Sequence, residues 1–186
     1  MRTFIAIKIP DIVKSELIQI TDKLKSSRAD LKWVKPEGIL LTLKFLGNID
    51  EQKATEVKEV LNKVVKAEVP FEIRLEGLGA FPKPASPRVI WAGVKEGAQN
   101  TINLAKNLEE QLEKIGFEKE RRSFHPHLTL GRLRSPQNKG KLSNLLESTK
   151  FKSSSIIKVA RLNLIQSTLT PTGAIYTVLY QAELGR

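Results

Sequence analysis

The chain has 186 residues, enough for a sizeable hydrophobic core, and its 40% hydrophobic and 27% charged residues are ordinary for a folded domain. It has no cysteine, which excludes disulfides and thiolate metal sites, and its two histidines have no clustered carboxylates beside them, so we expect no metal and no cofactor. The net charge of +11 favours polyanions such as RNA, DNA or nucleotides as partners, although a lysine-rich solubilising surface would give the same charge. With no signal peptide and no apolar run near the ~20 residues of a membrane span, we expect a cytoplasmic protein without a membrane partner.

In chain order, hydrophobic periodicity predicts alternating strands and helices in the first half. The predicted strands are 2–9, 31–34, 39–47, 71–76 and 88–94, and the predicted helices are 11–26 and 51–67. Glycines and prolines between 77 and 84 predict a loop, so the last two of these strands form an antiparallel pair.

The second half repeats this order. Its predicted helices are 100–115 and 138–148, and its predicted strands are 125–133, 156–165 and 174–184, with a turn at 170–173. A repeat of this length indicates a duplicated lobe. We therefore predict an α/β fold (α+β type) with two similar lobes, each an antiparallel sheet with two helices, around a central cleft. The lobes correspond roughly to residues 1–95 and 96–186 and pack as one domain, 1–186.

Two strands of the repeat carry the same pattern, x-Leu-Thr-Leu. In the second copy His127 and Thr129 share one strand face, and His125 lies on that face too. In the first copy Leu40 stands where His127 stands in the second, and Thr42 matches Thr129. The repeat predicts that the two strands face each other across the cleft.

Two such strands suit chemistry on a phosphate. Threonine hydroxyls can bind its non-bridging oxygens, while one imidazole takes a proton from water and another gives a proton to the leaving oxygen. The usual pKa of histidine suits both tasks, and the natural substrate of such a pair is a cyclic phosphodiester.

Several segments, in order along nearly the whole chain, resemble the 2H phosphoesterases, most closely the RNA 2′,3′-cyclic phosphodiesterases once named 2′-5′ RNA ligases. The matching segments are RTFIAI (2–7), TLKFLG (42–47), RVIWAGV (88–94), PHLTLGR (126–132), STLTP (167–171) and Tyr176. The resemblance implies a bilobal fold, two His-x-Thr motifs and metal-independent opening of terminal cyclic phosphates to 2′-phosphomonoesters. It also implies that His127 is the proton acceptor and that Thr42 and Thr129 bind phosphate.

The resemblance places the proton-donating histidine at position 40, where this chain has Leu40. Leucine cannot donate a proton. Three interpretations remain open. The chain is a natural homologue that binds cyclic-phosphate RNA ends but cleaves them poorly, or an altered copy of an active enzyme, or a protein in which His125 replaces the missing donor.

Further substrate-binding candidates surround these strands. Lys44 is expected on the face of Thr42, and Arg132 on the face opposite His127, from where it reaches RNA at the rim or is structural. Phe4 and Tyr176 are candidates for stacking on a base, although aromatic strand residues often belong to the core, as we expect for Trp91.

The leading function is thus an RNA 2′,3′-cyclic phosphodiesterase, a hydrolase. The alternatives are a non-catalytic protein that binds RNA or nucleotide ends in the same cleft and a plain basic nucleic-acid-binding module. No apolar helix face is left to demand a partner, so we expect a monomer.

Overall fold

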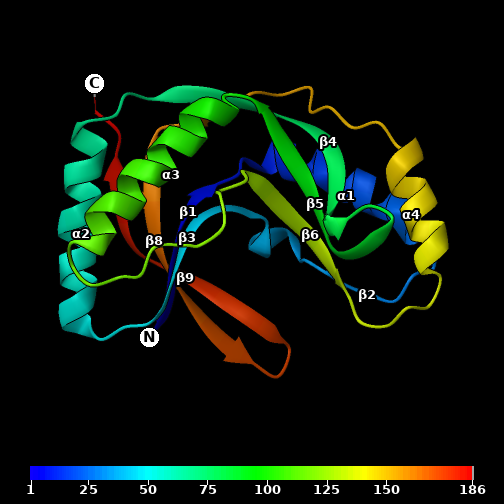
Figure 1. The fold of residues 1–186 in the computed structure, drawn as a ribbon, viewed down its shortest axis with the longest axis horizontal. Helices are drawn as coiled ribbons and strands as arrows, with labels where there is room; N and C mark the ends of the chain where they lie inside the picture. Colours follow the sequence, from blue (N-terminus) through cyan, green and yellow to red (C-terminus); the bar gives the residue numbers. More distant parts are fainter. Residues whose placement is uncertain (186) are drawn as a thin grey trace.

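The computed structural model describes residues 1–185 and contains two antiparallel sheets with helices on their outer sides (Figure 1). The first sheet has the strand order β3 (Leu40–Asn48), β1 (Arg2–Lys8), β8 (Arg161–Thr170) and β9 (Gly173–Glu183). The second has the order β2 (Leu31–Trp33), β6 (His127–Leu133), β5 (Ser86–Glu96), β4 (Phe71–Lys83) and β7 (Ile157–Val159). The predicted α/β architecture with two antiparallel sheets is confirmed.

The two sheets are not built from the two halves of the sequence. Each sheet takes strands from both halves, so the expected boundary near residue 95 does not separate them. The single strand predicted over 156–165 is wrong for the same reason, because the chain passes from β7 at the edge of the second sheet to β8 in the first. The loop predicted over 77–84 is also wrong, since β4 runs through it to Lys83.

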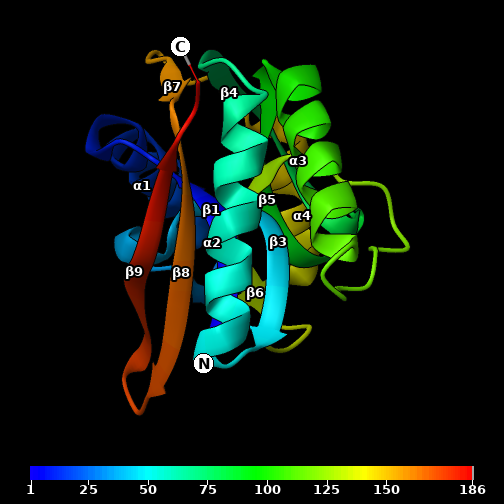
Figure 2. The ribbon, with the colours of Figure 1, turned by 90° about the vertical axis from the view of Figure 1, so that its left-hand side faces the viewer.

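Four α-helices cover the outer sides of the sheets, close to the predicted ranges. They are α1 (Asp11–Lys25), α2 (Glu51–Lys66), α3 (Ala98–Glu113) and α4 (Lys139–Ser148). The helices α2 and α3 pack on each other beside the first sheet, while α1 and α4 lie beside the second (Figures 1 and 2). The N-terminus of α2 is capped by Asp50, whose side chain accepts a hydrogen bond from the Lys53 backbone N–H at 2.8 Å. No helix within residues 1–185 is long and apolar enough to span a membrane.

A shared core joins the two sheets where β3 meets β6. Leu41 and Leu43 of β3 are buried in the same hydrophobic cluster as Leu128 and Leu130 of β6, and the two strands contact each other. Each fully buried leucine contributes about 1.5–3 kcal/mol to folding. Because side chains alternate along a strand, burying these leucines leaves the threonines between them on the opposite face.

Candidate functional site

The strand β3 presents Leu40 and Thr42 on the face away from the shared core. Thr42 pairs with Ala6 of β1, and Leu40 pairs with Lys8, so all four residues lie on this face. Leu40 is half-buried and packs in a small apolar cluster whose other members are Phe4, Ala6, Ile165 and Val178. The neighbours of Leu40 are therefore mainly apolar, and the charged neighbour on this face is Lys8, directly opposite on β1.

The prediction that Lys44 shares the face of Thr42 is wrong. A β-bulge inserts Leu43 between the pairs Ala6–Thr42 and Ile5–Lys44, and this extra residue reverses the alternation. Lys44 is consequently 5% exposed and donates to the Glu109 carboxylate at 2.8 Å and to the Glu118 carbonyl at 2.7 Å. It ties β3 to α3 and to the loop beyond it, and is not available for a phosphate.

The strand β6 begins at His127, and the geometry fixes which ring nitrogen is free. The Nδ1 atom of His127 lies 2.5 Å from the backbone carbonyl oxygen of His125, which can only accept. Nδ1 therefore carries the proton, and the neutral ring keeps its lone pair on Nε2. Thr129 follows on the same face and is half-buried, like His127. His125 itself precedes β6 and is exposed.

Burial keeps His127 in its neutral form. Removal from water lowers the pKa of His127 below its usual value, the hydrogen bond to the His125 carbonyl opposes this change, and positive charge on His125 and Arg132 adds to it. A neutral imidazole with a free Nε2 is a proton acceptor at neutral pH. The environment therefore favours a base at position 127.

Arg132 lies on the face of His127, contrary to the prediction. The extra residue Leu130 stands between the pairs Trp91–Thr129 and Ile90–Gly131, so Arg132, opposite Val89, returns to the side of Thr129. Its guanidinium is exposed and is one of the charges that lower the pKa of His127. A substrate anion near His127 would lie within the field of this charge.

Aromatic rings surround His127 on the second sheet. The ring of Phe81 lies 5.0 Å from that of His127 and meets it edge-on, and Trp91 lies 6.2 Å from His127 and 4.8 Å from His125. Trp91, which we expected in the core, is only half-buried. Its indole lies over Gly79, where an added Cβ would come within 2.3 Å of the ring. The sequence reasoning missed Phe81 and Gly79. The signal was the small residue opposite Trp91, which leaves room for the indole.

A second aromatic group lies on the first sheet. The ring of Phe4 contacts Tyr176 at 5.2 Å and Phe45 at 5.9 Å. Phe4 is only 5% exposed, whereas Tyr176 and Phe45 are 39% and 64% exposed, so the accessible surface belongs to the latter two. Phe45, which no sequence argument singled out, reaches this face through the same bulge that turns Lys44 inward.

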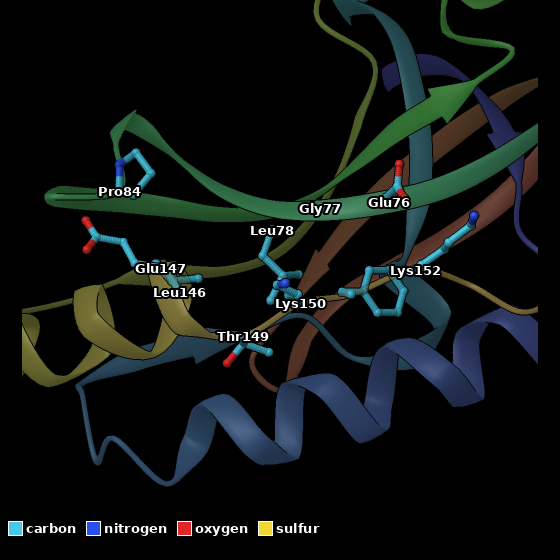
Figure 3. Close-up of a pocket in the computed structure, with 10 residues that line it drawn as sticks. Glu76, Gly77, Leu78, Pro84, Leu146, Glu147, Thr149, Lys150 and Lys152 are labelled. Carbon is cyan, nitrogen blue, oxygen red and sulfur yellow. The ribbon is translucent and has the colours of Figure 1, made fainter.

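Within residues 1–185, no group of three or more histidine, aspartate or glutamate side chains could hold a metal ion. One open groove lies away from β3 and β6, between β4 and the end of α4, where Leu78, Leu146 and Lys150 are among its lining residues (Figure 3). Leu78 and Leu146 belong to the cluster that packs under α1 and α4, so this groove is on the helix-covered side of the second sheet. It is separate from the histidine and threonine face.

The structure thus pairs a His-x-Thr strand, β6, with a contacting strand of matching Leu-x-Thr sequence, β3, in a two-sheet α/β fold. The family model described as LigT like phosphoesterase matches residues 7–91 and again residues 93–176, as a duplication requires. The chain belongs to this family of 2H phosphoesterases.

Curated relatives cover almost the whole chain. The RNA 2′,3′-cyclic phosphodiesterase of Thermotoga maritima is 39% identical over 183 residues, covering 98% of this chain and 95% of the relative. That of Methanothermobacter thermautotrophicus is 36% identical and covers 95% of both chains. Among solved structures, a protein of Thermus thermophilus has a TM-score of 0.84 at 29% identity, covering 99% and 98% of the two chains. Escherichia coli LigT complexed with 3′-AMP has a TM-score of 0.80 at 24% identity, with coverage of 100% and 98%, which shows the shared fold.

Proposed function

We propose that the protein acts on RNA ends that carry a 2′,3′-cyclic phosphate and opens them to 2′-phosphomonoesters without a metal ion. The observation that carries the proposal is His127, a neutral imidazole whose Nδ1 is tied to a carbonyl and whose Nε2 is free, beside Thr129. The names of the curated relatives support the choice of substrate. We place the reaction in the cytoplasm and assign the activity to the monomer.

In the proposed reaction the cyclic phosphate lies between Thr42 and Thr129, whose hydroxyls donate to its non-bridging oxygens. Water attacks phosphorus in line with the leaving 3′ oxygen. His127 Nε2 takes the water proton as the new P–O bond forms. The P–O3′ bond breaks, and the 3′ oxygen takes a proton, which leaves a 2′-phosphomonoester and a free 3′ hydroxyl.

The weak point of this reaction is the proton for the 3′ oxygen. The side chain at position 40 lies on the face of Thr42 and would adjoin the leaving oxygen, but Leu40 has no proton to give. His125 does not replace it, because its ring lies on the second sheet, 5.9 Å from that of His127 and 4.8 Å from that of Trp91. The leaving oxygen must then be protonated by solvent, and we expect turnover to be slow.

The same observation favours a second candidate, a protein that binds cyclic-phosphate RNA ends and scarcely cleaves them. Hydrolysis of a 2′,3′-cyclic nucleotide and affinity for a nucleoside 2′-monophosphate, measured with and without a chelator, distinguish the two. For the enzyme, His127→Ala abolishes a slow but measurable turnover, and Thr129→Val weakens affinity. For the binder, both variants weaken affinity and no turnover is found. If neither variant changes affinity or turnover, the site does not lie on β3 and β6, and a basic nucleic-acid-binding surface is the better description.

A further inference from the structure

A second pocket opens on the same face of the first sheet, next to the proposed site. It has a volume of about 320 Å³, and its charged lining residues are Lys8, Lys158 and Arg161. Two amide side chains, the buried Asn163 and the exposed Gln181, also line it. Neither the family comparison nor the cyclic-phosphate chemistry uses these residues.

Strand register connects this pocket to Thr42. Thr42 pairs with Ala6, Ala6 pairs with Asn163, and Asn163 pairs with Gln181, so one row of side chains crosses all four strands on this face. Strands are about 4.8 Å apart, so Asn163 lies about 10 Å from Thr42. Lys8, directly opposite Leu40, stands at the near edge of the pocket.

The charges of the pocket are mostly unneutralised. The ion pairs within residues 1–185 leave Lys8 and Lys158 without a carboxylate within 4 Å, whereas Arg161 lies 3.4 Å from the exposed Glu183 carboxylate. Two free ammonium groups around a concave surface attract a phosphate, and each contact releases a condensed counterion.

The two amide side chains are hydrogen-bonded to each other. Asn163 is 1% exposed, donates to the Ala6 carbonyl at 3.2 Å and accepts from Gln181 Nε2 at 2.8 Å. With its Nε2 committed in this way, the exposed Gln181 keeps Oε1 as an acceptor. A ribose 2′-hydroxyl beside the bound phosphate could donate to this oxygen, which deoxyribose cannot do.

We propose that this pocket binds the phosphodiester that joins the terminal nucleotide of the RNA to the nucleotide before it. The inference rests on the proposed function, because it assumes that the terminal phosphate lies between Thr42 and Thr129. Lys8 and Lys158 contact the internal phosphate and make the protein prefer an RNA end of two or more nucleotides to a mononucleotide.

The test compares two stable product-like ligands by calorimetry, a nucleoside 2′-monophosphate and a ribodinucleotide that ends in a 2′-phosphate. The variant is Lys8→Ala/Lys158→Ala, and the control with the same loss of charge is Lys63→Ala/Lys106→Ala, two exposed helix lysines. We expect the pocket variant to bind the dinucleotide about tenfold more weakly and the mononucleotide within twofold of the parent, while the control changes neither. The salt dependence of dinucleotide affinity should fall by about 0.7 in log–log slope per lost phosphate contact.

Equal losses for both ligands, no loss for either, or no measurable dinucleotide binding by the parent would overturn the pocket assignment. If the proposed function is wrong, Thr129→Val should leave the affinity for the mononucleotide unchanged. The difference in affinity between the dinucleotide and the mononucleotide would still test the pocket, so the two failures are distinguishable.

Discussion

Replacing Leu40 by histidine should restore the proton donor that the proposed reaction lacks. The new imidazole would share its strand face with Thr42 and stand opposite Lys8. A positioned general acid contributes about 10²- to 10⁴-fold, which corresponds to about 3–5 kcal/mol of barrier. We therefore expect kcat for a 2′,3′-cyclic nucleotide to rise by at least about a hundredfold in Leu40→His.

The substitution should not prevent folding. Leu40 is only half-buried, in a cluster with Phe4 and Ile165, so its loss from apolar contact costs about 1 kcal/mol, a small part of a typical 5–15 kcal/mol stability. Thermal unfolding measured beside the assay checks this. The matched control is Leu40→Gln, which offers a hydrogen-bond donor but no proton to transfer.

Two further readouts separate proton donation from better binding. With His127 as the only titrating group, kcat/KM should rise with pH and then stay level, whereas Leu40→His should give a bell-shaped profile. An aryl nucleotide diester, whose phenolate leaves without a proton, should gain little from the new histidine. If a folded Leu40→His protein is no faster than Leu40→Gln with the cyclic nucleotide, position 40 does not adjoin the leaving oxygen, and the assignment of β3 to that side is wrong.

Two other predictions concern charges at and beside the site. Burial and the charge of Arg132 lower the pKa of His127, so the ring should stay neutral and active below pH 6.5. Arg132→Ala should therefore raise the midpoint of the His127 titration measured by NMR. A midpoint that does not move, or that falls, would contradict the placement of Arg132 on this face. Lys44→Met should lower the free energy of unfolding by about 2–4 kcal/mol, because it leaves the Glu109 carboxylate, whose side chain is 20% exposed, without its ion-pair partner. In denaturant unfolding, Lys44→Met/Glu109→Gln should recover part of this loss. Unchanged stability combined with weaker nucleotide affinity would instead indicate that Lys44 contacts the substrate.

The helices and the duplication were predictable because their signals are long. An apolar stripe over three or more turns, such as that of α2, survives an error of one or two residues, and the repeated order of elements depends on no single residue. The assignment of strands to sheets was not predictable in this way. Nothing in the residue pattern of 156–165 indicates that the chain leaves one sheet at Val159 and joins the other at Arg161.

Some site residues were predictable from the sequence and others were not, depending on whether a bulge lies beside them in the strand. His127, Thr129 and Thr42 were predictable from alternation, because no bulge separates them from the buried Leu41 and Leu128. Lys44 and Arg132 were misplaced because a single inserted residue reverses every side chain beyond it. The positions of the bulges show in the pairing between strands, and the alternation of residues within one strand does not reveal them.

The two bulges occupy equivalent positions in the repeat, so β3 and β6 present matching rows of side chains on the face of their threonines. Leu43 follows Thr42, and Leu130 follows Thr129, and each is the extra residue of its strand. In both copies the bulge therefore returns the third residue after the threonine to the face of that threonine, which brings Phe45 there on β3 and Arg132 there on β6.

The backbones of β3 and β6 are thus alike, but the side chains that they present on this face are not. The first strand offers the apolar side chains of Leu40 and Phe45, and the second offers the imidazole of His127 and the guanidinium of Arg132. On this face of the chain the charged and titrating groups lie on β6. Leu40→His therefore measures how much the proposed reaction gains from a titrating group on β3.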